Sequence, residues 1–147
     1  MDLTPRLIMY FRDEGMDEPK CTTLALVLSE AITNALDHGV LGLNSSLKAE
    51  GFEAYEAARQ ARFERLESGE VGIQVQLNGQ GPLMDLQVSS ADIRVWDSGP
   101  GFDWEAVAGP SPEGVPSGRG LAIIRAVSSR VEFIPPGNQI SFRIEFE

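Results

Sequence analysis

The spacing of hydrophobic residues divides the chain into a helical first half and a strand-rich second half. Apolar residues recur at intervals of three and four in most of the chain up to residue 68, and at every second position from Val71 to Leu77 and from Ile140 to Phe146. Helices are predicted at 4–14, from 19 or 20 to 39, at 52–68 and at 121–129. Strands are predicted at 71–77, 83–88, 92–97, 131–134 and 140–146. This order predicts an α+β fold, a two-layer sandwich with helices on one face of a mixed, mostly antiparallel sheet.

Composition and charge narrow the class of protein. The 147 residues, 42% of them hydrophobic, suit one domain (residues 1–147), in which the helix at about 52–68 is an insertion. Twelve Lys and Arg against 22 Asp and Glu leave a net charge of −10, which argues against a nucleic-acid partner. A single cysteine excludes a disulfide scaffold, and no apolar run reaches the roughly 18–20 residues that span a bilayer. We therefore expect a cytoplasmic domain with no membrane partner.

A stripe of polar residues interrupts the predicted helix that ends at residue 39. At about 100° per residue, Glu30, Asn34 and Asp37 fall within about 60° of one another, with His38 at the edge. Because the rest of this helix is almost wholly apolar, the stripe predicts a lined cleft. A carboxylate one turn from an amide suits a hard cation, or a general base beside a cation ligand. The same pattern is also compatible with a half-exposed helix whose polar face meets water.

A second polar segment follows the predicted strand 92–97. Asp97 stands at the end of this strand, and Gly99 and Gly101 come directly after it. Glycines let the backbone turn sharply and approach a flat ligand closely. The carboxylate can accept a hydrogen bond from an exocyclic amine such as that of adenine. An ordinary hairpin-like turn would use the same residue types.

A third segment precedes the predicted helix 121–129. Gly118 and Gly120 leave the first amides of this helix free, and those amides with the helix dipole form an anion site. Arg119 lies where it could add a charge-assisted contact. The alternative is a helix that is simply capped by Ser117. Neither a Rossmann fingerprint nor a P-loop fits, because no strand directly precedes the segment and no Gly-Lys-Ser/Thr occurs.

Taken together, the three segments supply what a nucleoside triphosphate with magnesium requires. From about Leu24 to the C-terminus, interrupted by 40–68, the sequence resembles the GHKL ATPases, whose nucleotide site is the Bergerat fold. Residues 30–39 resemble the asparagine box of this family, 97–102 its first glycine box, and 117–121 its second. Within the family, the short segment between the glycine boxes is most similar to that of the anti-sigma-factor serine kinases of the RsbW and SpoIIAB type.

The resemblance implies a role for each matching residue. Asn34 would ligate Mg²⁺ on the phosphates of ATP, and Glu30 would be the catalytic base. Asp97 would hold the adenine amino group, with Gly99 and Gly101 shaping the wall beside it. The remaining nucleotide contacts implied by the resemblance are Asp37, His38, Gly118, Arg119, Gly120 and Leu121.

The resemblance also implies a substrate and partners. It predicts transfer of the ATP γ-phosphate to a serine of an anti-sigma-factor antagonist (a STAS domain), with a sigma factor and a second copy as further partners. The alternative is a non-catalytic ATP-binding module that docks the antagonist or regulates an attached PP2C-type phosphatase. Because the leading strand of the family is missing, we expect a C-terminal module fused to upstream phosphatase and receiver domains. The inserted segment 40–68 is either additional packing or a partner surface.

Overall fold

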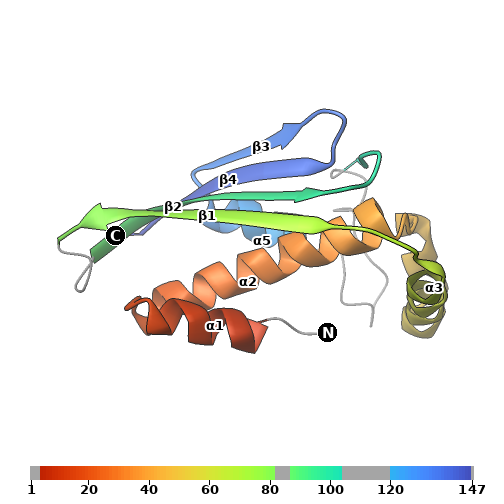
Figure 1. The fold of residues 1–147 in the computed structure, drawn as a ribbon, viewed down its shortest axis with the longest axis horizontal. Coiled ribbons are helices and arrows are strands. Elements are labelled where there is room, and N and C mark those ends of the chain that lie inside the picture. The colour runs from red at the N-terminus through yellow and green to blue at the C-terminus, as the bar shows by residue number, and fades with distance from the viewer. Residues whose placement is uncertain (1–3, 82–86, 104–119, 147) are drawn as a thin grey trace.

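The computed structural model describes residues 4–81, 87–103 and 120–146, and these form one sheet with helices on one side (Figure 1). The helices are α1 (Thr4–Asp13), α2 (Glu18–Asn34), α3 (Phe52–Arg65) and α5 (Gly120–Val127), with a π-helical turn η1 (Ala35–Val40) and a 3₁₀ turn η2 (Ser45–Glu50). The strands are β1 (Val71–Gln80), β2 (Gln87–Asp97), β3 (Arg130–Ile134) and β4 (Gln139–Glu145). The predicted α+β class is confirmed. Every pairing among the described strands is antiparallel, in the order β1-β2-β4-β3, so the mixed component is not seen there.

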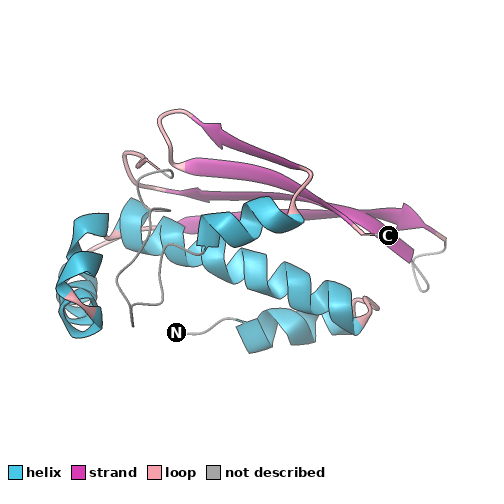
Figure 2. Ribbon diagram, turned by 180° about the vertical axis from the view of Figure 1, so that it is seen from behind, coloured by secondary structure: helices cyan, strands magenta, loops and turns pink. Residues whose placement is uncertain are grey.

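The core lies between the sheet and the helices α1, α2 and α5. Figure 2 shows α2 and α5 beneath the sheet from behind, and α1 packs against α2. Alternate positions of the strands point to this side, so Ile93 and Val95 of β2 face the same core as Phe142 of β4. Leu24 and Leu28 fill it from α2. Within the described part of the chain, no helix combines the length and the apolar character that crossing a membrane requires.

The strand β2 corrects the prediction of two short strands at 83–88 and 92–97. In the structure, the backbone continues as one strand from Gln87 to Asp97; residues 83–86 lie outside the described residues. The polar pair Ser89–Ser90 is typical of a turn, but Ser90 is only 2% exposed. Its Oγ accepts hydrogen bonds from Asn78 Nδ2 and Arg143 Nη2, each at 3.1 Å. Both neighbouring strands therefore satisfy this polar group inside the sheet.

The helix α2 begins close to its predicted start and ends differently. Asp17 caps it by accepting a hydrogen bond from the Lys20 amide at 3.3 Å, and Pro19 lies in the first turn. Regular α-helix stops at Asn34, and the chain continues to Val40 as the π-helical turn η1. The assumption of about 100° per residue therefore fails beyond Asn34.

The inserted segment forms a small layer of its own beside the end of α2 (Figure 1). The helix predicted at 52–68 is present as α3, which ends at Arg65 because Leu66 is extended. Leu41, Leu43 and Tyr55 form a second buried cluster between η1 and α3. The insertion thus packs on the turn that follows Asn34.

Candidate functional site

The carboxylate of Asp97 lies at the end of β2 and is held by backbone groups. The Asp97 amide donates to the Asn138 carbonyl at 2.9 Å, and Asn138 Nδ2 donates to the Asp97 carbonyl at 3.3 Å. The Gly99 amide donates to Asp97 Oδ1 at 2.7 Å. The turn after β2 therefore fixes one oxygen of the side chain.

The other oxygen of Asp97 is buried without a hydrogen-bond partner among the described residues. Asp97 is 3% exposed, and its Oδ2 is fully buried. Burial raises the pKa of this carboxyl above its usual value, while the hydrogen bond from the Gly99 amide acts in the opposite direction. A buried acceptor of this kind needs a donor. The exocyclic amine of a nucleobase would supply this hydrogen-bond donor, so the residues present fit adenine.

Two glycines bring the end of η1 against Asp97. A Cβ added at Gly39 would overlap with Cγ and both carboxylate oxygens of Asp97. A Cβ added at Gly99 would overlap with the carbonyl of Gly39. Because no other residue type fits this space, the structure joins the end of the asparagine-box segment to the first glycine segment through backbone contact.

Gly101 completes this turn on the other side. Its φ of +98° lies in the left-handed region, and a Cβ there would overlap with the Pro136 carbonyl. The next amide, that of Phe102, donates to the Gly137 carbonyl at 3.4 Å. The turn between β3 and β4 thus contacts the segment 99–102 and fixes its backbone.

Glu30 and Asn34 lie one turn apart on the same face of α2. Both side chains are half-buried. The described residues contain no cluster of three or more His, Cys, Asp or Glu side chains that could hold a metal alone. A cation held by Asn34 would therefore take its other ligands from the phosphates and water, as Mg²⁺ commonly does.

Asp37 does not continue the stripe of Glu30 and Asn34, because η1 replaces the last α-helical turn. Its carboxylate instead accepts hydrogen bonds from Tyr55 Oη at 2.9 Å and from Arg59 Nε at 2.7 Å, both on α3. Burial, followed by the charge of Asp37, raises the pKa of Tyr55. The sequence pattern did not identify Tyr55 or Arg59 as partners of Asp37. The signal in the sequence that could have indicated them is that Tyr55 and Arg59 lie one helical turn apart in the predicted helix 52–68, and therefore on the same face.

His38 is buried beside the first glycine segment. Its Nδ1 donates to the Leu43 carbonyl at 2.8 Å, and its ring lies 5.7 Å from that of Phe102, centroid to centroid. The imidazole therefore links η1 both to the inserted segment and to the turn after β2.

The second glycine segment is described only from the start of α5. Gly118 and Arg119 lie outside the described residues, whereas Gly120 is the first residue of α5. Leu121 is 1% exposed, and its side chain belongs to the core.

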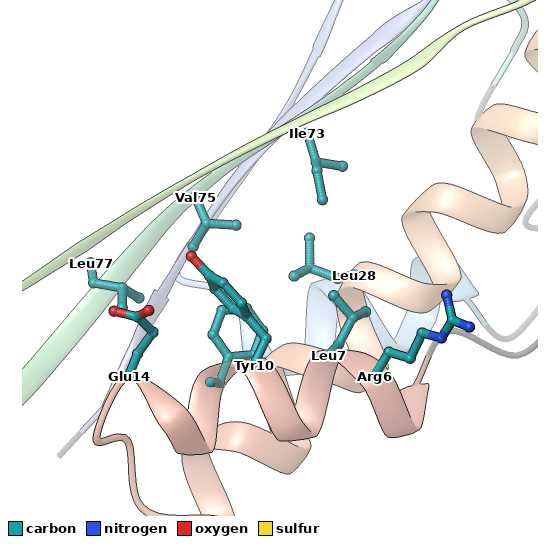
Figure 3. Close-up of a pocket in the computed structure, with 9 residues that line it drawn as sticks. Arg6, Leu7, Tyr10, Glu14, Leu28, Ile73, Val75 and Leu77 are labelled. Carbon is teal, nitrogen blue, oxygen red and sulfur yellow. The ribbon is translucent and has the colours of Figure 1, made fainter.

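A separate hollow lies between α1 and β1, and Figure 3 shows side chains from both elements facing it. Its volume is about 420 Å³, and its lining is mostly apolar, with Leu7 and Tyr10 opposite Val75. None of the residues predicted to bind nucleotide lines this hollow. The hollow is therefore not part of the candidate site.

Comparison with known proteins identifies the family of this chain. The family model described as "Histidine kinase-like ATPase domain" matches residues 7–144, which is almost the whole chain. A comparison with curated proteins found no match. The predicted resemblance to GHKL ATPases is confirmed at this level, and domains of this type bind ATP. Because this match covers residues 7–144, the chain belongs to the histidine kinase-like ATPase domains of the GHKL superfamily.

Proposed function

We propose that this domain is a protein serine kinase that binds ATP with Mg²⁺ and phosphorylates a STAS-domain anti-sigma-factor antagonist. The observation that carries the ATP site is Asp97 Oδ2, which is buried, unpartnered among the described residues and in contact with Gly39. An amine of adenine supplies the missing donor. The kinase step is supported by a carboxylate, Glu30, one turn from the amide of Asn34, and the antagonist by the resemblance of the short segment between the glycine boxes to that of the anti-sigma-factor serine kinases.

In this proposal, Asn34 holds the cation and Glu30 acts as the base. When bound, Mg²⁺ neutralises charge on the phosphates. The Glu30 carboxylate accepts the proton of the substrate serine hydroxyl as the serine oxygen bonds to the γ-phosphorus, and the bond from that phosphorus to ADP breaks. Phosphoryl transfer asks the protein mainly for positioning and charge stabilisation, which a carboxylate and an amide one turn apart on a packed helix provide.

The cation role is tested by titrating ATP with and without Mg²⁺ into wild type and Asn34→Ala, with thermal unfolding as the measurement. ATP with Mg²⁺ should raise the unfolding temperature of wild type and have little effect on Asn34→Ala. Asn44→Ala, which changes an exposed asparagine near α3, is the matched control and should behave as wild type. Equal protection of Asn34→Ala and wild type would refute the role of Asn34.

The kinase step is tested with γ-labelled ATP and purified STAS-domain antagonists. Glu30→Gln should bind ATP but leave the antagonist unlabelled, whereas Glu64→Gln, an exposed change on α3, should label it normally. Labelling by Glu30→Gln at the wild-type rate would place the base elsewhere. Wild type that binds ATP but labels no antagonist would instead identify the non-catalytic regulatory module.

A further inference from the structure

The helix α3 is attached to η1 by a partly buried ion pair. Arg59 Nε lies 2.7 Å from Asp37 Oδ1, and the two side chains are 23% and 5% exposed, respectively. Tyr55 Oη donates to the second carboxylate oxygen at 2.9 Å. Both carboxylate oxygens of Asp37 thus accept hydrogen bonds from residues of α3. The buried negative charge of Asp37 is therefore compensated by the inserted segment.

A second set of bonds holds the far end of the same turn. Arg62 Nη1 donates to the Leu41 carbonyl at 3.2 Å, and the Leu43 amide donates to the Asp37 carbonyl at 2.8 Å. The segment between Asp37 and Leu41 is therefore attached to α3 at both ends. Gly39, which contacts Asp97, lies inside this segment.

The turn needs such support because of its geometry. A π-helical turn is rare and occurs mostly as a single turn within an α-helix, frequently at a functional site. Gly39 has no side chain to anchor it, yet its backbone forms the wall against Asp97 and Gly99. Small displacements at a binding site have large effects on affinity, so the position of this backbone matters for the ligand.

We infer that Tyr55 and Arg59 are positioning residues of the nucleotide site: by fixing Asp37, they hold Gly39 against Asp97. This inference rests on the proposed ATP site. The inserted helix is then a working part of the site. A substitution on α3 would then shift the position of Asp97, the proposed adenine-binding residue. The contacts that transmit this shift run from Arg59 to Asp37, through η1 to Gly39, and from Gly39 to Asp97.

The test compares Arg59→Ala with Arg65→Ala. Both variants remove one arginine from α3, but the described contact of Arg65 is a bond from its Nε to the Ala61 carbonyl of its own helix, at 3.3 Å. For Arg59→Ala, the Kd for ATP with Mg²⁺ should rise on the order of tenfold, comparable with the loss of an orienting group in a metal site. Arg65→Ala should keep the wild-type Kd, and Arg59→Lys should recover part of the affinity. The measurement is calorimetric titration well below the unfolding temperature, where a merely stabilising residue leaves the Kd unchanged.

Hydrogen exchange without nucleotide makes the coupling measurable by itself. The Gly99 amide, which donates to Asp97 Oδ1, should exchange faster in Arg59→Ala and in Tyr55→Phe than in Arg65→Ala. Wild-type ATP affinity together with unchanged Gly99 exchange in Arg59→Ala would overturn the inference. Absence of ATP binding in wild type, with faster Gly99 exchange in Arg59→Ala, would refute the proposed function while supporting the coupling.

Discussion

Asp97→Asn tests most directly the proposed contact between the Asp97 carboxylate and adenine. Oδ1 of Asp97 accepts from the Gly99 amide at 2.7 Å, and an asparagine would keep this bond with its amide oxygen. Its NH₂ group would then occupy the place of Oδ2, the buried atom without a partner among the described residues. The substitution therefore changes the atom that faces the ligand from an acceptor to a donor, with almost no change in shape.

The expected loss of affinity follows from that exchange. A hydrogen bond to a charged group contributes about 1.5–3 kcal/mol, so the Kd for ATP should rise about 10- to 150-fold. The free protein should not suffer, because burial raises the pKa of Asp97 and thus disfavours its charged form. Asp97→Asn should therefore be at least as stable as wild type at neutral pH.

Calorimetric titration with ATP and urea unfolding of the free protein are the two assays. Weaker binding combined with undiminished stability supports the role of Asp97, because the loss cannot then come from unfolding. GTP serves as a second probe, since guanine carries a carbonyl oxygen where adenine carries the amine. An Asp97→Asn protein that binds ATP with the wild-type Kd would refute the reasoning.

Three further predictions concern stability. The pKa of Asp97 in the folded protein lies above its ordinary value of 3.8, so the unfolded chain loses this proton at lower pH than the folded protein does. The free energy of unfolding should therefore decrease as the pH rises from 3.8 to the folded pKa. Urea titrations at several pH values should show this decrease in wild type and not in Asp97→Asn. Gly39→Ala should lower the free energy of unfolding by about 1–3 kcal/mol and weaken ATP binding, because its methyl group overlaps Asp97; wild-type values in urea and ATP titrations would contradict the packing. Phe142→Ala, at a core position 1% exposed, should cost about 3–5 kcal/mol in urea unfolding, whereas Phe63→Ala, 51% exposed, should change it little.

The sheet, most helices and the family follow from local patterns in the sequence. The alternation from Val71 and from Ile140 predicted strands with one buried face, because successive side chains of a strand point to opposite sides. The strand β4 shows this alternation of buried positions, whereas in β1 Ile73 is 43% exposed. The order of Glu30, Asn34, Asp97 and the glycines indicated the GHKL family, because each motif is a short run of residues whose types already define its chemistry.

Only the tertiary structure decided how these pieces meet. Ser89–Ser90 continues a strand because Asn78 and Arg143, distant in sequence, supply its hydrogen bonds. After Asn34 the α-helix changes to the π-helical turn η1. Asp37 therefore pairs with Arg59 of α3 and does not lie on the same face as Glu30 and Asn34. In each case, the hydrogen bonds that decide the local structure join residues separated by ten or more positions. The spacing of hydrophobic residues within one element cannot predict such bonds. The sequence by itself determined most of the elements and the chemistry they carry, and long-range contacts determined how the strand β2 and the turn η1 form and which side chains reach the site.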